Sequence, residues 1–372
     1  MANVLSLVSY KIFPAKLGGQ KGIALFNKYF SAYHTVVCVT IKDNDPAYAN
    51  YKVLNILSNS KLRYINVFYF FTISRIIKKY RISHLIVEHP YYGWLGLWLK
   101  KFCRIKMITH SHNIEAQRFK SVGKWWWLIL RQYEKYIYQQ SDKVFCISEE
   151  DRKYIIANLK VTPQKCTVIT YGIEWDHAPT TAERLEAKMY LENKYDIAPG
   201  TILYFFNGTL DYMPNLNAVK IILNEINPVL LSSDLNYKII ICGKNLPAQM
   251  NELKEYSNKN IIYAGFVDDV SIYFKGTDIF INPVTDGGGI KTKLVEALGY
   301  DLAAVSTFNG AVGIDKEICN GKLVLVNGND WKFFANKMKE VKNISSAITT
   351  DYFEHFYWNN IAGKAGEAID NL

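Results

Sequence analysis

The chain has 372 residues, enough for two domains of ordinary size, and its 49% hydrophobic and 21% charged residues are typical of a globular rather than a disordered protein. No apolar run approaches the roughly 18 residues that a membrane-spanning helix needs, no signal peptide is recognised, and six scattered cysteines favour reduced thiols in the cytoplasm. Residues 1–175 contain 26 basic and 10 acidic residues, whereas residues 176–372 contain 18 and 24. The basic first half predicts an anionic partner: a phosphorylated substrate, a membrane surface or a nucleic acid.

Short apolar runs alternate with helical patterns through the first half of the chain. Strands are predicted at residues 3–10, 34–41, 84–89, 106–110, 143–148 and 167–172, and helices at residues 20–30, 70–80, 92–102, 125–140 and 149–159. This alternation is typical of a parallel sheet with crossover helices.

A glycine pair follows the first predicted strand, where FPAKLGGQKG brings Gly18 and Gly19 to the start of a helix. The spacing is not the G-x-G-x-x-G of a dinucleotide fold, and no acidic residue ends the second strand where a nicotinamide cofactor would need one. The segment therefore predicts a tight turn and argues against a dinucleotide cofactor.

His110 and His112 lie in THSHNIEAQRF, directly after another predicted strand. Two histidines at this spacing are compatible with a metal site, but no third ligand stands at a familiar spacing from them. The sequence therefore predicts no metal. A satisfied polar side chain at a strand end is the alternative interpretation of His112.

Aromatic and basic residues alternate in two stretches, residues 91–106 and 124–140, a composition typical of a membrane interface with anionic lipid. Each stretch alone is equally compatible with a core helix that has a solvated basic end. No helix-turn-helix, zinc-finger or RNA-recognition motif is visible, so nucleic acid is not expected as a partner.

The strand–helix alternation restarts after a polar stretch at residues 174–199. Strands are predicted at residues 201–208, 237–243, 260–266, 278–282, 302–307 and 322–326, and helices at residues 215–231, 247–256, 268–274 and 289–298. Two Rossmann-like domains follow, residues 1–175 and 176–350. Because ligands bind beyond the carboxyl ends of parallel strands, we expect a ligand in the cleft between them.

The most informative segment is residues 283–307, in which a strand leads into three glycines and a helix. This order presents free backbone N–H groups to an anion, and glycines allow a phosphate to approach the chain closely. Glu296 lies farther along the helix, where it could bind a sugar hydroxyl. A glycine-rich surface turn with two solvated lysines is the alternative. The candidate anion-binding residues are Gly287, Gly288, Gly289, Ile290, Lys291, Thr292 and Lys293.

The same segment resembles the donor-binding signature of the family-4 retaining glycosyltransferases, which have the GT-B fold. The matching residues are Pro283, Asp286, the three glycines, and Glu296 followed by Ala297. The first glutamate of the usual family pair is replaced by Gly288, as in a subgroup with a GGGIKxK motif, and Asp286 is the candidate to replace it. The resemblance implies two α/β domains whose parallel sheets face a central cleft, with residues 351–372 packing back on the first domain.

Other segments extend the resemblance. Residues 206–215, FNGTLDYMPN, lack the Arg and Lys that many members use on the diphosphate, so Lys291 and Lys293, and more weakly Lys244, are expected to supply that charge. Residues 265–270 resemble the segment whose backbone contacts the base, and Asp268 is also expected to cap a helix. By resemblance His112 lies near the transferred sugar. The implied contact residues are Gly18, Gly19, Asn113, Asn207, Gly208, Thr209, Val267 and Asp268.

Together these features predict a retaining, metal-independent glycosyltransferase, with His112, Asp286 and Glu296 as candidate catalytic residues. It would transfer a sugar from a nucleoside-diphosphate sugar to a hydroxyl of a glycan or lipid-linked acceptor in envelope polysaccharide synthesis, such as O-antigen or capsule. The expected location is cytoplasmic, on the inner membrane face. A sugar-nucleotide epimerase of the same fold and a non-catalytic membrane-binding module remain the alternatives.

Overall fold

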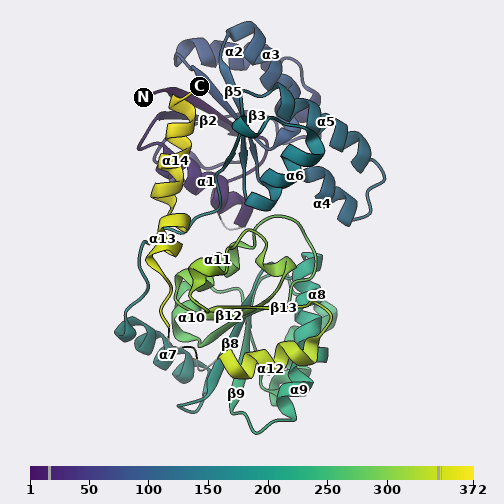
Figure 1. Cartoon of the computed structure of the whole chain (residues 1–372), viewed down its shortest axis with the longest axis vertical. Coiled ribbons are helices and arrows are strands. Elements are labelled where there is room, and N and C mark those ends of the chain that lie inside the picture. The colour runs from purple at the N-terminus through teal and green to yellow at the C-terminus, as the bar shows by residue number, and fades with distance from the viewer. Residues whose placement is uncertain (16–17, 342–343, 345) are drawn as a thin grey trace. The chain divides into compact units, whose positions relative to one another are not determined.

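The computed structural model describes residues 1–15, 18–341, 344 and 346–372. The chain forms two units: unit 1 contains Met1–Glu174 and Phe356–Leu372, and unit 2 contains Trp175–His355 (Figure 1). The chain re-enters unit 1 at Phe356, a few residues later than the expected position 351.

Unit 1 is built on a seven-stranded parallel sheet in the order β3-β2-β1-β4-β5-β6-β7. Its strands are β1 (Asn3–Val8), β2 (Thr35–Ile41), β3 (Lys52–Leu57), β4 (His84–Glu88), β5 (Lys106–Ser111), β6 (Lys143–Cys146) and β7 (Cys166–Val168). Its helices are α1 (Gly18–Phe30), α2 (Tyr69–Lys79), α3 (Gly93–Cys103), α4 (Glu115–Ser121), α5 (Trp127–Gln140), α6 (Glu149–Leu159) and α14 (Trp358–Asp370). Sequence analysis missed β3, an edge strand whose side chains are mostly half-buried.

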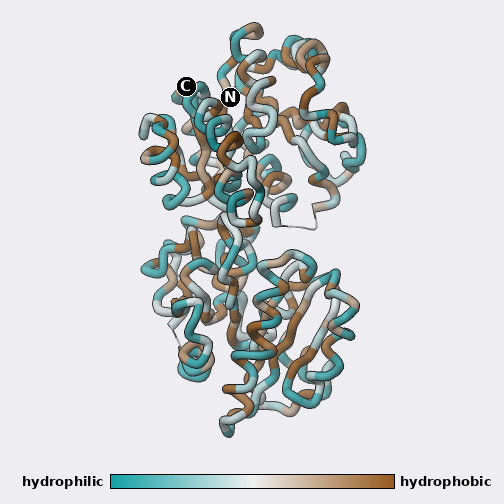
Figure 2. The backbone as a smooth tube through the Cα atoms, turned by 90° about the vertical axis from the view of Figure 1, so that its right-hand side faces the viewer, coloured by the Kyte–Doolittle hydropathy of each residue, from teal (hydrophilic) through white to brown (hydrophobic). Residues whose placement is uncertain are grey.

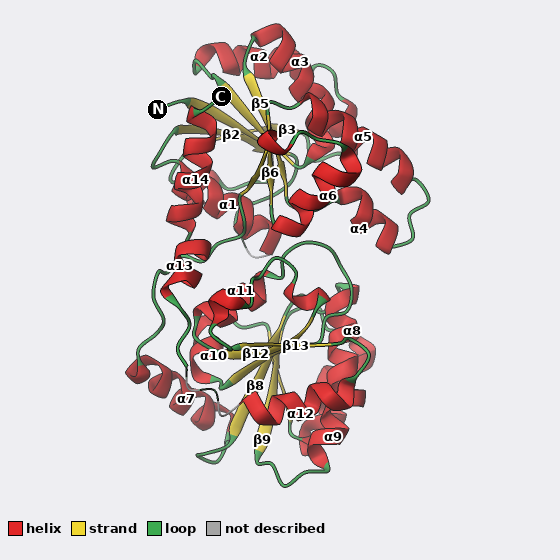
Figure 3. Ribbon diagram, in the orientation of Figure 1, coloured by secondary structure: helices red, strands yellow, loops and turns green. Residues whose placement is uncertain are grey.

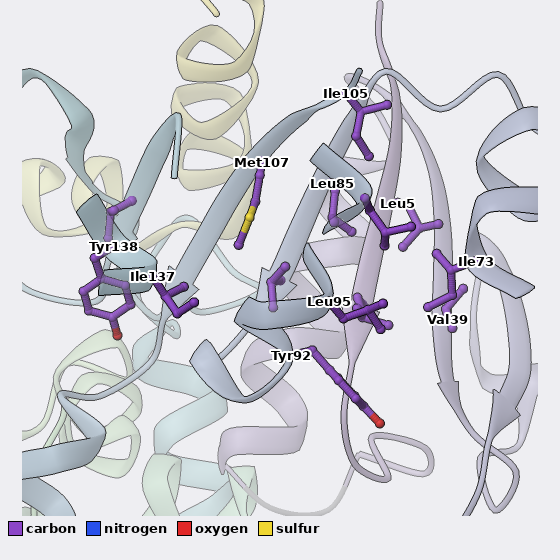
Figure 4. Packing of buried hydrophobic residues seen from close by; sticks show 14 of the residues in the cluster. Leu5, Val39, Ile73, Leu85, Tyr92, Leu95, Ile105, Met107, Ile137 and Tyr138 are labelled. Carbon is purple, nitrogen blue, oxygen red and sulfur yellow. The ribbon is translucent and has the colours of Figure 1, made fainter. Parts of the chain in front are cut away.

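Both faces of this sheet are covered, which explains why its strands read as nearly continuous apolar runs. Leu5 and Leu7 of β1 belong to the larger core cluster, which includes residues of α2, α3 and α5 (Figure 4). Val8, on the opposite face of the same strand, packs with Ile23 and Ala24 of α1. Figure 2 shows hydrophobic segments, in brown, that alternate with hydrophilic ones along the tube.

Unit 2 contains a six-stranded parallel sheet in the order β10-β9-β8-β11-β12-β13, flanked by helices (Figure 3). Its strands are β8 (Ile202–Asn207), β9 (Tyr237–Cys242), β10 (Ile261–Gly265), β11 (Ile279–Asn282), β12 (Ala303–Thr307) and β13 (Leu323–Val326). Its helices are α7 (Thr181–Tyr195), α8 (Met213–Ile221), α9 (Asn227–Leu231), α10 (Ser271–Gly276), α11 (Thr292–Gly299), α12 (Trp331–Val341) and α13 (Thr350–Phe356). The two α/β sheets predicted from sequence are confirmed.

Two expected helices of unit 2 are irregular. The segment predicted at residues 215–231 is divided into α8 and α9 by a π-helical turn at Ile222–Ile226, which ends two residues before Pro228, whose missing N–H removes one helical donor. The segment predicted at residues 247–256 is 3-10 helix, Ala248–Lys259, interrupted by left-handed residues at Asn251, Glu252 and Leu253.

Each sheet has one point at which the strand order reverses, between β1 and β4 in unit 1 and between β8 and β11 in unit 2. The loops that leave the carboxyl ends of two such strands diverge, and the crevice between them is where open α/β sheets bind ligands. The fold alone therefore indicates one candidate ligand-binding position in each unit.

The C-terminal helix α14 completes unit 1 by packing against α1. Trp358 is 2% exposed and packs edge-on against Tyr171, and a Cβ added to Gly172 would lie 2.7 Å from the Trp358 ring. The Tyr33 hydroxyl donates to the backbone carbonyl of Asn359 at 3.2 Å. The helix is therefore an integral layer of unit 1.

We expect Trp358→Ala to lower the free energy of unfolding of unit 1 by about 3–5 kcal/mol, because it leaves a large cavity where no other side chain can collapse. Urea unfolding followed by circular dichroism measures this. Trp125→Ala is the matched control, since Trp125 is 82% exposed and its loss should change stability by less than about 0.5 kcal/mol. Equal effects of the two substitutions would contradict the structural role of α14.

Candidate functional site

The glycine segment of unit 2 follows the carboxyl end of β11, where the strand order of the sheet reverses. We call such a reversal the switch point of the sheet. Gly287 and Gly289 have φ of 87° and 70°, a left-handed conformation that other residues adopt only with strain. The Lys291 ammonium donates to the carbonyl oxygens of Gly287, Gly288 and Gly289 at 2.9, 3.3 and 2.9 Å. The lysine thus holds the loop in one shape, and the alternative of a solvated lysine is wrong for this residue.

Lys293 lies in the first turn of α11 and is a cation held by neutral groups. Its Nζ donates to the carbonyl of Asn207 at 3.1 Å and to Oδ1 of Asn215 at 2.9 Å, and lies 4.0 Å from the centroid of the Phe206 ring. No carboxylate among the described residues forms an ion pair with it. Burial, and secondly the charge of Lys291, hold the pKa of Lys293 well below its ordinary value. A bound anion would therefore stabilise this site, because it would compensate the positive charge of Lys293.

Loops from neighbouring strands surround these lysines. A Cβ added to Gly208 would lie 2.7 Å from Asn215, and one added to Gly287 would lie 3.0 Å from the Tyr212 hydroxyl, so only glycine permits these approaches. Thr209 accepts a hydrogen bond from Asn215 at 3.0 Å through its carbonyl. The structure therefore brings Asn207, Gly208, Thr209 and the glycine loop to one edge of the sheet.

The remaining predicted residues of unit 2 follow the neighbouring strands. Lys244 comes after β9, where its carbonyl accepts from the Leu210 amide at 2.9 Å, and Val267 and Asp268 come after β10. The expected cap at Asp268 is wrong: Asp269 accepts the Ser271 amide at 2.8 Å instead.

Asp286 and Glu296 differ in environment. Asp286 is exposed and accepts a hydrogen bond from the Thr285 hydroxyl at 3.1 Å. Glu296 is half-buried inside α11, and Ile290 and Thr292 are half-buried at its start.

Unit 1 places a buried carboxylate at its own switch point. Glu88 ends β4, and its Oε2 lies 2.6 Å from Nε2 of His112 and 3.0 Å from Nδ1 of His110. Its Oε1 accepts a hydrogen bond from the Ser6 hydroxyl at 3.3 Å. Burial alone would raise the pKa of Glu88, but its interactions with the two histidines outweigh burial and lower it. Sequence analysis missed Glu88, which is the third group beside the two histidines.

A second buried carboxylate, Glu115, lies beside the first. Its Oε1 is 3.1 Å from Nδ1 of His89, and its Oε2 accepts from the Tyr91 hydroxyl at 2.7 Å and from Arg118 at 2.6 Å. The other nitrogen of His89 contacts the Tyr10 hydroxyl at 3.1 Å. Sequence analysis did not identify these residues. Their position at or shortly after the carboxyl end of a predicted strand was the feature that could have indicated them.

His89 has a backbone conformation that is otherwise reserved for glycine, with φ 65° and ψ 157°. Such strain costs about 1–3 kcal/mol and persists only where surrounding contacts hold it. Here the contacts are the two hydrogen bonds of its ring and its packing against Tyr91 and His112. Because such strain clusters at functional sites, this end of β4 is a candidate functional position.

Among the described residues, Glu88, His110 and His112 form a group whose ligand atoms could hold a metal ion. Two ligands that share a tetrahedral zinc ion, each about 2.0–2.1 Å from it, lie roughly 3.3 Å apart. The 2.6 Å between Glu88 and His112 is instead a charge-assisted hydrogen bond. The geometry therefore favours a carboxylate–imidazole pair.

The other predicted residues of unit 1 lie around this cluster. Gly18 and Gly19 begin α1, and a Cβ on Gly19 would lie 3.8 Å from the Tyr10 hydroxyl. His112 and Asn113 are half-buried in the loop after β5, and the carbonyl of Asn113 accepts from the Ser111 hydroxyl at 2.9 Å.

The pKa of Glu115 makes unit 1 sensitive to acid. Burial would raise this pKa, but His89 and Arg118 outweigh burial and lower it to about 2. Because the folded pKa lies below the ordinary value of 4.5, the ionised carboxylate stabilises the fold above pH 4.5, and this contribution is lost as the pH falls to 2.

We therefore expect Glu115→Gln to be less stable than the wild type by up to about 3 kcal/mol at pH 7, with the gap closing between pH 4.5 and 2. Denaturant unfolding at several pH values measures the gap. Glu149→Gln, which changes an exposed carboxylate, should follow the wild type throughout. A gap as wide at pH 2 as at pH 7 would show that the charge of Glu115 has no such effect.

Residues 23–177 match the family described as Glycosyltransferase Family 4, and residues 201–343 match that described as Glycosyl transferases group 1. An uncharacterised 44.6 kDa protein in the cps region of Klebsiella pneumoniae is 26% identical over 41% of this chain and 40% of its own length. An uncharacterised glycosyltransferase of Methanocaldococcus jannaschii is 25% identical over 62% of each chain. The chain thus matches less than two thirds of the length of these relatives.

Solved structures resemble the whole chain at low identity. The sucrose-phosphate synthase of Thermosynechococcus elongatus has a TM-score of 0.76 at 13% identity, covering 100% of this chain and 99% of its own. HepE of Anabaena, solved in complex with UDP, has a TM-score of 0.73 at 13% identity, covering 100% of both chains. WaaG, a glycosyltransferase involved in lipopolysaccharide biosynthesis, has a TM-score of 0.67 at 14% identity, covering 98% of this chain and 99% of its own. The chain therefore has the GT-B fold, and residues 23–177 and 201–343 are similar to two families of glycosyltransferases.

Proposed function

We propose that the protein is a retaining hexosyltransferase that takes a sugar from a nucleoside-diphosphate sugar bound by unit 2. The observation that carries this proposal is Lys293, a cation held on two neutral oxygens and an aromatic face at the switch point of the sheet. A diphosphate supplies the missing negative charge, and hydrogen bonds to charged groups are the strong ones. HepE, whose fold this chain shares, was solved with UDP, with UDP and glucose, and with UDP-glucose, which supports a donor of this class.

In the proposed reaction the bond between the anomeric carbon and the diphosphate oxygen breaks, and the acceptor oxygen bonds to the same face of the sugar. The acceptor proton passes to the departing phosphate oxygen, so the reaction needs neither a metal ion nor a carboxylate nucleophile. Lys291, Lys293 and the amides of the glycine loop stabilise the negative charge of the leaving diphosphate. Glu296 orients the donor sugar, and Asp286 replaces the missing glutamate of the family pattern.

The proposed acceptor is a hydroxyl of a glycan or lipid-linked saccharide in envelope polysaccharide synthesis, bound through unit 1. Two relatives by fold support this class: WaaG, and WaaB, described as a lipopolysaccharide outer core galactosyltransferase. Glu88 and Glu115 are already paired at the end of β4, so this part of unit 1 suits a neutral hydroxyl better than a second diphosphate.

Lys293→Met tests the donor site. The substitution keeps most of the side-chain volume and removes a buried charge, so we expect a fold at least as stable as the wild type and binding of UDP or GDP weakened roughly 10- to 100-fold. Calorimetric titration measures binding, and repeating it with EDTA should give the same dissociation constant if no metal takes part.

Lys275→Met is the control, because Lys275 pairs with Glu183 away from the glycine loop. Unchanged nucleotide binding in Lys293→Met would refute the donor site. A donor whose sugar is converted without any acceptor would indicate an epimerase instead of a transferase.

We further propose that unit 1 contacts the inner membrane face through the segment joining α4 and α5. Val122, Trp125, Leu128 and Ile129 are 52–82% exposed, and Lys120 and Lys124 are exposed beside them. Apolar side chains flanked by lysines suit an interface with anionic lipid.

The other expected stretch is divided: Leu95 and Leu99 of α3 are fully buried and Lys100 pairs with Asp142 at 3.0 Å, whereas Trp98 and Phe102 are 45% and 65% exposed. Of the residues described, none belong to a helix that is long and apolar enough to cross a membrane. Contact through α4 and α5 would therefore be peripheral.

We expect the protein to co-sediment with vesicles containing anionic lipid at low salt and to be released at high salt, because salt screens surface charge. Lys120→Ser with Lys124→Ser should reduce binding, and Trp125→Ala with Ile129→Ser should reduce it further. Lys11→Ser with Lys42→Ser, elsewhere in unit 1, is the charge-matched control. Equal binding to neutral and anionic vesicles, or none at all, would contradict membrane contact through this segment.

A further inference from the structure

The pair formed by Glu88 and His112 defines which ring nitrogen of the histidine carries the proton. An ionised carboxylate only accepts hydrogen bonds, so the 2.6 Å contact between Glu88 Oε2 and His112 Nε2 requires a proton on Nε2. In a neutral imidazole the other nitrogen, Nδ1, is then an acceptor. Burial, followed by the neighbouring His110, lowers the pKa of His112 to about 3, which keeps the ring neutral at physiological pH.

Of the two histidines that contact Glu88, His112 is the one that a substrate can reach. Its side chain is 12% exposed, against 3% for His110, which lies beneath it. Nδ1 of His112 makes no hydrogen bond to any residue within the described parts of the chain. The ring therefore presents one unused acceptor.

A relay of hydrogen bonds from three elements holds Glu88 in this position. The buried amide of Asn27, on α1, donates to the Ser6 hydroxyl at 3.1 Å, and Ser6, on β1, donates to Oε1 of Glu88 at 3.3 Å. Because the amide occupies the oxygen of Ser6, the hydroxyl proton is directed to the carboxylate. Glu88 is thus fixed from behind while its other oxygen binds His112.

We propose that Glu88 is a positioning residue that fixes the Nε2-protonated tautomer of His112, so that Nδ1 accepts a hydrogen bond from the acceptor hydroxyl. This inference rests on the proposed function and assigns a role in acceptor recognition to a residue outside the donor site. Nδ1 holds the hydroxyl of the bound acceptor before the reaction, and the hydroxyl proton then leaves Nδ1 for the departing phosphate oxygen as the new bond forms. A carboxamide at residue 88 carries donors of its own, which would favour the opposite tautomer.

Nitrogen NMR of protein labelled with ¹⁵N-histidine tests the tautomer directly, because protonated and unprotonated ring nitrogens have separate chemical shifts. The His112 resonances are assigned by their loss in His112→Ala. We expect Nδ1 of His112 to be unprotonated in the wild type and partly or fully protonated in Glu88→Gln. Glu115→Gln, which alters the neighbouring carboxylate, should leave the His112 tautomer unchanged.

Kinetics with a donor and acceptor pair provide the functional readout. Glu88→Gln should lower kcat/KM for the acceptor roughly 10- to 100-fold, the loss expected for one hydrogen bond, while calorimetric binding of the nucleoside diphosphate stays at the wild-type value. Glu88→Asp, which retains the charge, should recover both the tautomer and part of the activity. If Glu88→Gln does not fold, the wild-type spectrum still decides the tautomer, and His112→Ala, which removes the Nδ1 acceptor, replaces Glu88→Gln in the kinetic measurement.

A wild-type His112 that is protonated on Nδ1, or on both nitrogens, would overturn the proposal. So would a tautomer change in Glu88→Gln that leaves acceptor kinetics unaltered. If the wild type binds nucleotide but transfers no sugar to any hydroxyl, the proposed function fails, whereas the NMR measurement still decides whether Glu88 fixes the tautomer.

Discussion

The parallel arrangement of both sheets is the constraint on which the rest of the molecule depends. Parallel strands need crossover helices, which bury both faces of the sheet and direct every carboxyl end to the same edge. The strand order reverses once in each sheet, beside β1 and β4 or β8 and β11. The glycine loop and the carboxylate–histidine cluster both lie at these reversals, so topology, rather than local sequence, brings their residues together.

The two candidate sites differ in how their charged groups are paired. In unit 1, Glu88 and Glu115 are paired with histidines and Arg118, so both carboxylates have partners without a ligand. In unit 2, Lys293 rests on neutral oxygens, an arrangement that lowers stability unless an anion is bound. The paired carboxylates of unit 1 need no charged ligand, which suits the binding of a neutral group. The uncompensated charge of Lys293 suits the binding of an anion.

Sequence patterns predicted most of the strands, because a strand covered on both faces is apolar throughout, and they located the glycine loop, because its backbone angles require glycine. They missed β3, whose edge position leaves its side chains half-buried. They missed Glu88 as well, because its contact with His112 joins the end of β4 to the loop after β5, 24 residues away in the sequence. The cap assigned to Asp268 was wrong by one residue, since either adjacent aspartate fits the pattern.

Unit 1 is discontinuous in sequence: its last layer, α14, is the final helix of the chain described here, whereas unit 2 is formed by one uninterrupted stretch. A ribosome makes all of unit 2 before it makes α14, and domains generally fold as units during synthesis. The surface formed by α1 and the turn after it, which contains Tyr33 and His34, therefore stays uncovered while residues 175–355 are translated. The second unit in the sequence is consequently the first that can finish folding.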